Sequence, residues 1–330
     1  MTAVFKLPYP LVLESEGVLD DVSVAYRAWG KLDASGGNAV LICHALTGNA
    51  DADEWWEPLI GSGRSLDPDR DFIVCSNILG SCYGTTGPGD GYGDAFPQIT
   101  IRDMVALQRA LIRHLGIHRL RLVIGGSLGG MQVLEWALAA PDLVESIAPI
   151  AISGRHSPWA IALSEAQRQA IYIDRERGLA VARMIAMSTY RSHAGYQARF
   201  GRERKDERFA VEKWLQDHGE RLVRRFNPDS YLRLTEAMDS HDVARGRGGY
   251  EEVLASIHQP TLVVSIDTDV LYPPFEQEEL ASLIPNATLQ TIQSPHGHDA
   301  FLMEGQALNE LVVDFRQRQS GPARLRVARG

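Results

Sequence analysis

Short apolar runs alternate with longer stretches of helical periodicity along most of this chain. Most of the runs are continuously apolar and partly β-branched, which is typical of strands buried on both faces of a sheet. We expect strands at residues 22–28, 39–43, 72–75, 120–124, 147–152, 261–266 and 287–292. Between them, apolar side chains recur at helical spacing, as in residues 101–115, and predict helices. The alternation predicts an α/β fold built on a doubly wound, mostly parallel sheet.

The pattern changes between residues 153 and 249. Arginine, glutamate and alanine are frequent in this segment, and it contains no clear strand run. We interpret it as a helical insertion that caps the carboxyl edge of the sheet. The core then comprises residues 1–152 and 250–318, and residues 319–330 are expected to form a flexible tail.

The composition narrows the possible partners. The chain has 330 residues, of which 45% are hydrophobic, and a formal net charge of −9. An acidic surface disfavours binding to nucleic acids and to anionic membranes, so small-molecule substrates are the better expectation.

Local composition also bears on the compartment. Residues 1–17 carry one lysine, two prolines and two glutamates, which does not match a signal peptide, and no apolar run approaches a membrane span. Three cysteines suit a reducing compartment better than a disulfide framework. We therefore expect a cytoplasmic protein, and no spacing of cysteines or histidines suggests a metal site.

Ser127 carries the strongest chemical signal. It lies in a Gly-x-Ser-x-Gly motif, residues 125–129, between the predicted strand 120–124 and an apolar helical stretch at 131–139. Glycines on both sides allow a sharp turn from strand to helix that exposes the serine Oγ. The N-terminus of the following helix favours negative charge developing on an attacked carbonyl. The motif therefore predicts acyl transfer through a serine ester.

A nucleophilic serine of this kind needs a histidine as its base. In chain order an acid should follow a late strand, and the histidine should follow the last strand. His296 and His298 both follow the predicted strand 287–292. We favour His298, because Gly297 lets the chain swing the imidazole back over the sheet, whereas His296 follows Pro295 and is better suited to shaping the loop.

Two aspartates are candidates for the acid that orients the histidine. Asp267 and Asp269 both follow the predicted strand 261–266, and spacing barely separates them. We favour Asp269, since an aspartate at the position of Asp267 commonly caps the turn at a strand end.

The oxyanion hole needs two backbone N–H groups. One should come from Leu128, which follows the nucleophile, and the other from the loop at residues 44–48. We favour Leu46 over its neighbour Ala45. Alternatively, this segment is only a polar turn that His44 stabilises.

The acyl acceptor is left open by these residues. Water would make the protein an esterase, lipase or peptidase, and an alcohol would make it a transferase. A non-catalytic binding module is the least expected class, because a serine, an acid and a histidine are all present in order.

Longer motifs narrow the choice. They are His-Ala-Leu-Thr-Gly at 44–48, Gly-Gly-Ser-Leu-Gly-Gly-Met-Gln at 125–132 and Gly-His-Asp-Ala-Phe-Leu at 297–302, with residues 75–80, 82–88, 100–105, 231–232, 237–239, 242–246 and 271–274. These segments closely resemble the homoserine O-acetyltransferase family of the α/β-hydrolase fold, over nearly the whole chain. The resemblance implies an α/β-hydrolase core with a helical lid and a triad of Ser127, Asp269 and His298.

The resemblance also implies two substrate contacts. The family binds its amino-acid substrate through an arginine in an Ala-Arg-Met string, here Arg183, and through the aspartate after the catalytic histidine, here Asp299. A guanidinium and a carboxylate would hold the carboxylate and the ammonium of L-homoserine. On residue type alone, Arg183 would be a solvated arginine and Asp299 a helix cap.

By resemblance, the reaction moves an acetyl group from acetyl-CoA, a substrate and not a bound cofactor, to L-homoserine. The product is O-acetyl-L-homoserine for methionine biosynthesis, and the protein is expected to be a homodimer joined through the cap. Residues 185–192 depart from the usual family pattern, and the cap is shorter than expected. Both differences lie where substrates are selected, so a succinyl-CoA donor, a serine acceptor and an esterase with the same triad are alternatives.

Overall fold

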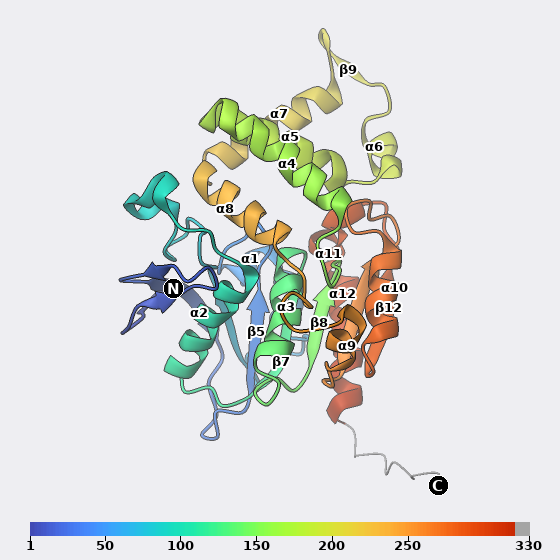
Figure 1. The fold of residues 1–330 in the computed structure, drawn as a ribbon. Coiled ribbons are helices and arrows are strands. Elements are labelled where there is room, and N and C mark those ends of the chain that lie inside the picture. Colours follow the sequence, from blue (N-terminus) through green and yellow to red (C-terminus); the bar gives the residue numbers. More distant parts are fainter. Residues whose placement is uncertain (321–330) are drawn as a thin grey trace.

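The computed structural model describes residues 1–320, and a single large sheet forms its centre. The sheet has eight strands in the order β1-β4-β6-β5-β7-β8-β11-β12 (Figure 1). β4 pairs antiparallel with β1 and β6, and all other neighbours are parallel. The predicted mostly parallel α/β sheet is therefore confirmed. Its strands are β1 (Ala3–Lys6), β4 (Ser23–Trp29), β5 (Ala39–Cys43), β6 (Phe72–Ser76), β7 (Leu120–Gly126), β8 (Ile147–Ile150), β11 (Thr261–Ile266) and β12 (Ala287–Ile292).

The strand ends differ from the sequence prediction where the backbone changes direction. β5, β11 and β12 have the predicted bounds, whereas β8 ends two residues before the expected position 152. The cause is Ala151, whose φ of 49° takes the chain out of the extended conformation.

Hydrophobic layers on both faces explain why the central strands are continuously apolar. Along β5, Leu41 and Cys43 belong to one buried cluster, and Val40 and Ile42 belong to the other, because successive side chains of a strand point to opposite faces. The first cluster includes side chains of α2 (Ile101–His114), α3 (Leu128–Ala139), α9 (Tyr250–Ala255) and α10 (Pro274–Leu283). The second includes side chains of α1 (Ala52–Trp55), η1 (Glu57–Leu59), α11 (Ala300–Met303) and α12 (Gly305–Ser320).

The segment between β8 and α9 lies beyond the carboxyl edge of the sheet (Figure 1). α4 packs against α5, α5 also packs against α7, and α8 contacts both α4 and α5. Two short paired strands, which no apolar run marks in the sequence, form a small hairpin within it. These cap elements are α4 (Pro158–Ile173), α5 (Arg175–Tyr190), α6 (His193–Phe200), β9 (Arg204–Lys205), β10 (Arg208–Phe209), α7 (Ala210–Val223) and α8 (Pro228–Asp239).

The remaining elements are short, except for the end of α12. β2 (Leu11–Val12) and β3 (Val18–Leu19) form a hairpin, and η2 (Pro88–Tyr92) and η3 (Gly93–Ala95) precede α2. α12 includes residues 319 and 320, which the sequence pattern assigns to the tail, and the rest of that predicted tail lies outside the described residues. Within residues 1–320, no helix combines the length and apolar character that a bilayer crossing requires.

The turn between β7 and α3 places Ser127 at its tip. Ser127 has φ 56° and ψ −127°, a strained conformation for a residue with a side chain. The carbonyl oxygen of Cys43, at the end of β5, lies in close contact with this turn. A Cβ at Gly129 would lie 2.1 Å from that oxygen, and a Cβ at Gly125 would lie 2.6 Å from it. Only glycine fits at both positions, so the end of β5 and the start of α3 are in direct contact beside the serine.

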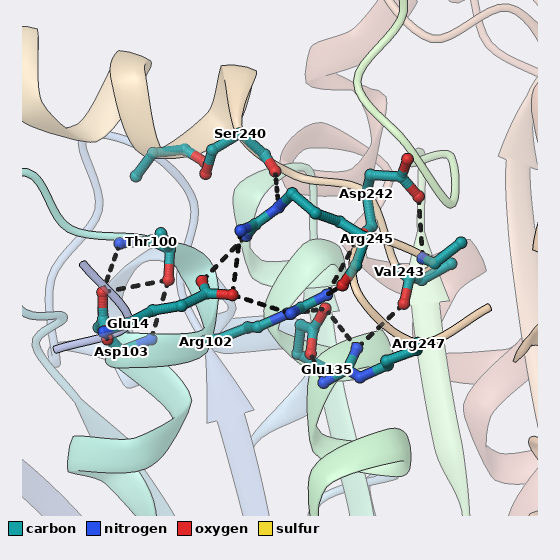
Figure 2. A network of polar contacts seen from close by, with 12 residues as sticks. Glu14, Thr100, Arg102, Asp103, Glu135, Ser240, Asp242, Val243, Arg245 and Arg247 are labelled. Carbon is teal, nitrogen blue, oxygen red and sulfur yellow. Dashed lines mark hydrogen bonds and ion pairs between the residues drawn. The ribbon is translucent and has the colours of Figure 1, made fainter. Parts of the chain in front are cut away.

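A network of arginines and carboxylates ties the chain after the cap to α2 and α3 (Figure 2). Glu135 of α3 is buried and accepts two hydrogen bonds from Arg247, of 3.0 and 2.7 Å, and a longer one from Arg102 of α2. Arg102 and Arg245 both donate to Glu14 in the N-terminal hairpin. The segment that returns from the cap is thus fixed to the helix that begins at the serine turn.

We expect Glu135→Gln to destabilise the fold through this network. The substitution leaves the Arg247 guanidinium without its carboxylate, and because this side chain is 26% exposed, the loss should be about 1–3 kcal/mol. Urea unfolding should show a corresponding loss in the free energy of unfolding. The matched control is Glu145→Gln, whose ion pair with Arg119 is largely exposed, and it should change stability by less than about 1 kcal/mol. Equal effects of the two variants would show that the network does not hold the cap return.

We expect Gly129→Ala to strain the contact between β5 and α3. The added methyl group has no space beside the Cys43 carbonyl, so the backbone must move, and overpacking of this kind costs at least about 1–3 kcal/mol. Gly17→Ala is the control, because its Cβ would meet no atom closer than 3.5 Å. Unfolding curves of both variants test whether this contact is as tight as described. Equal stability of Gly129→Ala and Gly17→Ala would show that it is not.

Candidate active site

A cavity of about 460 Å³ lies between the carboxyl edge of the sheet and the cap. Ser127, His298 and Asp299 line it from the core, and Arg183 and Arg225 line it from the cap. A larger hollow, of about 1030 Å³, lies at the opposite edge of the sheet, but no histidine lines it, and ion pairs within it join arginines to neighbouring carboxylates. The smaller cavity therefore holds the chemically useful residues. Within residues 1–320, no three His, Cys, Asp or Glu side chains are grouped as a metal site.

The structure brings His298 and Asp269 together. His298 Nδ1 lies 2.7 Å from Asp269 Oδ2, and both side chains are buried. The other carboxylate oxygen, Oδ1, accepts the backbone N–H groups of Leu271 (2.8 Å) and Tyr272 (3.0 Å). These bonds fix the carboxylate and leave Oδ2 directed at the imidazole. The proton on Nδ1 then leaves Nε2 as the free basic nitrogen.

The surroundings of His298 set its basicity. Burial alone would lower the pKa of the imidazole, but the charge and hydrogen bond of Asp269 outweigh it, with a smaller contribution from Asp299, and the pKa is raised above its ordinary value. The rings of Tyr190, Tyr272 and Phe301 surround the imidazole at centroid distances of 5.6, 5.4 and 5.5 Å. Nε2 has no hydrogen-bond partner among the described residues, and its side chain shares the cavity with Ser127.

The competing candidates lie elsewhere in the same loops. Asp267 Oδ1 accepts the backbone N–H of Ser294 at 2.9 Å, so this aspartate joins the loop after β11 to the loop after β12. The side chain of His296 is 38% exposed and lies 3.9 Å from Glu304. Neither residue lines the cavity, and both shape the loop that carries His298.

The loop after β5 is held by a buried histidine. His44 Nε2 accepts the backbone N–H of Ile78 at 3.2 Å, so the proton resides on Nδ1, which donates to the Ala45 carbonyl at 2.8 Å. The N–H of Gly48 donates to the same carbonyl at 2.9 Å. Because the C=O and N–H of a trans peptide point in opposite directions, the Leu46 N–H faces away from these donors.

Two backbone N–H groups are therefore placed near the serine. Leu46 lines the cavity, and Leu128 is the first residue of α3, whose N–H the helix itself does not use. Burial lowers the pKa of His44 to about 4, against the raising effect of its bond to Ala45, so the imidazole stays neutral and the loop geometry persists at neutral pH.

Arg183 and Asp299 both face the cavity. The guanidinium of Arg183 lies 5.4 Å from the ring centre of Tyr190. Asp299 does not cap the following helix with its side chain, and its Oδ2 lies 3.1 Å from a guanidinium nitrogen of Arg191. Burial raises the pKa of Asp299, and the charges of Arg191, Arg183 and His298 oppose that rise.

Several residues of the site were missed by sequence reasoning. Tyr190 follows Arg183 by two turns of α5 and so shares its face, a signal that helical spacing could have revealed. Arg191 falls in the stretch that departs from the family pattern. Tyr83 lies in the motif at residues 82–88, to which no role was assigned, and Arg225 has no local signal, because only the fold brings it to the cavity.

Comparison with known proteins identifies the family of the chain. Residues 38–304 match a family model described as alpha/beta hydrolase fold. The homoserine O-acetyltransferase of Trichormus variabilis is 60% identical over 96% of this chain and 94% of its own. The crystal structure of homoserine O-acetyltransferase from Staphylococcus aureus superimposes with a TM-score of 0.84 at 29% identity, covering 96% of this chain and 94% of the other. Esterase E22 superimposes with a TM-score of 0.88 at 25% identity, covering 96% and 99%. With this similarity over nearly its full length, the chain belongs to the homoserine O-acetyltransferase family of α/β-hydrolase fold enzymes.

Proposed function

We propose that the enzyme transfers an acetyl group from acetyl-CoA to the hydroxyl of L-homoserine through an acyl-serine at Ser127. The observation that carries this proposal is the placing of Arg183 and Asp299 on the same cavity as Ser127 and His298. A zwitterionic amino acid needs a cation and an anion beside the reacting group, and an esterase has no use for them. The product, O-acetyl-L-homoserine, would serve methionine biosynthesis.

The first half-reaction forms the acyl-enzyme. His298 Nε2 takes the proton of Ser127 while the Oγ attacks the thioester carbon. The backbone N–H groups of Leu46 and Leu128 bind the oxygen that becomes negative, and one such donor is worth about 100- to 1000-fold in rate. As the C–S bond breaks, His298 returns the proton to the sulfur, and CoA leaves as a thiol.

The second half-reaction uses the charges of the cap and the last loop. Arg183 would bind the carboxylate of homoserine, and Asp299 its ammonium, so that the hydroxyl faces the ester carbon. His298 deprotonates this hydroxyl, which attacks the acyl-serine, and the same proton returns to Ser127. No resident cofactor or metal ion enters the scheme, since acetyl-CoA is consumed as a substrate.

The ion pair between Arg191 and Asp299 affects this binding step. Arg191 supports the ionised form of a carboxylate that burial disfavours, and an ionised Asp299 is what an ammonium group requires. Homoserine would add a second cation to a carboxylate that already has one, as in many buried charge networks.

Hydrolysis is the second candidate function, and the similarity to esterase E22 favours it. The same triad and oxyanion donors would release acetate if water reached the acyl-serine. The esterase therefore differs from the transferase in its acceptor and not in its first half-reaction.

Thiol release separates these functions. We expect purified protein with acetyl-CoA to release one equivalent of CoA in a burst, and to continue releasing CoA rapidly only when L-homoserine is present. Turnover should be slower with L-serine as acceptor or with succinyl-CoA as donor. Arg183→Met should raise the KM for homoserine about 10- to 100-fold, the range for losing a hydrogen bond to a charged group, while CoA release in the acylation burst continues. Continuous CoA release at a rate that does not depend on homoserine would establish the hydrolase instead.

The pH profile tests the role of His298. The base acts when it is neutral, so its raised pKa moves the acidic limb of kcat/KM to higher pH than an unperturbed histidine would give. In Asp269→Asn, burial remains and the main raising influence is gone, so the limb should move to lower pH while the maximal rate falls.

The control for this shift is Asp267→Asn, which leaves the carboxylate beside His298 in place. Its acidic limb should coincide with that of the unmodified enzyme. A limb that stays fixed in Asp269→Asn would mean that another group controls the acidic side of the profile.

A further inference from the structure

Arg225 connects the cap to the loop at residues 44–48, which contains Leu46, the proposed oxyanion donor. It lies between α7 and α8, and its Nη1 donates to the Thr47 carbonyl and to the Tyr83 hydroxyl, each at 2.7 Å. Its Nη2 donates to Thr47 Oγ1 at 3.2 Å. One guanidinium from the cap therefore donates hydrogen bonds to both the main chain and the side chain of Thr47, the residue after Leu46.

The partners of Arg225 are all uncharged. Among residues 1–320, no carboxylate lies within ion-pair distance of it, whereas its neighbour Arg224 pairs with Glu220 within α7. A fork of planar donors suits several fixed oxygens at once, which a lysine ammonium does less well. Arg225 is thus suited to fixing the loop at residues 44–48, and it also lines the active-site cavity.

The loop is held from two sides by different parts of the chain. From the core, His44 and the N–H of Gly48 fix the Ala45 carbonyl, and hence the peptide whose N–H belongs to Leu46. From the cap, Arg225 fixes the carbonyl of Thr47, the next residue along. The Thr47 carbonyl and the Gly48 N–H belong to the same peptide group, and this N–H holds the Ala45 carbonyl. Arg225 therefore restrains, through one hydrogen bond, the peptide that carries the Leu46 N–H.

We propose that Arg225 is a positioning residue, through which the cap holds the Leu46 N–H in the oxyanion hole. The proposal rests on the acyl-serine mechanism given above. If so, the position of the Leu46 N–H depends on the cap. The first half-reaction then proceeds at full rate only when the segment between α7 and α8 packs against the loop at residues 44–48.

The competing role for an unpaired arginine at this cavity is binding of the phosphates of CoA. Two donors distinguish the roles, because p-nitrophenyl acetate carries the same acetyl group and no phosphate. Acylation rates should be measured with acetyl-CoA and with p-nitrophenyl acetate for Arg225→Met and Arg225→Lys, with Arg224→Met as the matched control.

We expect Arg225→Met to lower the acylation rate about 10- to 100-fold with both donors, since a misaligned donor costs part of the 100- to 1000-fold that its removal costs. The KM for homoserine should not change, Arg225→Lys should recover part of the rate, and Arg224→Met should match the unmodified enzyme. A loss confined to acetyl-CoA, or no loss with either donor, would overturn the proposal.

Thr47→Val keeps the test decisive if Arg225→Met does not fold. It removes only the hydroxyl that accepts from Nη2, so a smaller loss, equal for the two donors, is expected, and an unequal loss contradicts the proposal. If the unmodified enzyme is acylated by p-nitrophenyl acetate but not by acetyl-CoA, the proposed function fails while Arg225 remains testable. If neither donor acylates it, the oxyanion hole and the role of Arg225 are both refuted.

Discussion

The close approach of the Cys43 carbonyl to Gly125 and Gly129 is the contact on which the rest of the site depends. It brings the end of β5 against the start of α3 with no room for a side chain between them. One consequence is the strained turn that places Ser127 on the cavity. The other is that the loop beginning at His44 starts directly beside this serine. In the proposed mechanism, backbone packing therefore brings the nucleophile and its two oxyanion donors together before any substrate binds.

The cap adds what the core cannot supply. The core provides the triad geometry, which serves hydrolases and transferases equally. The cap contributes Arg183 to the cavity, and its Arg191 holds Asp299 beside the catalytic histidine. Cap and core are joined by charged groups rather than by a continuous apolar surface alone, as the network around Glu135 shows (Figure 2). In the proposed function, substrate choice depends on long side chains that reach the cavity from the cap.

Local signals were sufficient for seven of the eight strands of the sheet and for the serine turn, because strand burial and the need for glycine both show in neighbouring residues. The edge strand β1 was missed, because only one of its four residues is buried. The choice between Asp267 and Asp269 could not be made from spacing, since it depends on which carboxylate meets the imidazole in space. Arg225 left no trace at all: its acceptors on Thr47 and Tyr83 come from distant parts of the chain. Long-range polar contacts of this kind follow from the packing of the cap and not from any periodic pattern.

The central claim is that the acetyl group rests on Ser127 and then passes to homoserine, and mass spectrometry of the Ser127 peptide tests it most directly. Protein mixed with acetyl-CoA alone and quenched within one turnover should carry one acetyl group on this serine. Addition of L-homoserine before the quench should remove the label and yield an equal amount of O-acetyl-L-homoserine. An unlabelled Ser127 peptide, or a label that homoserine does not discharge, would contradict the account.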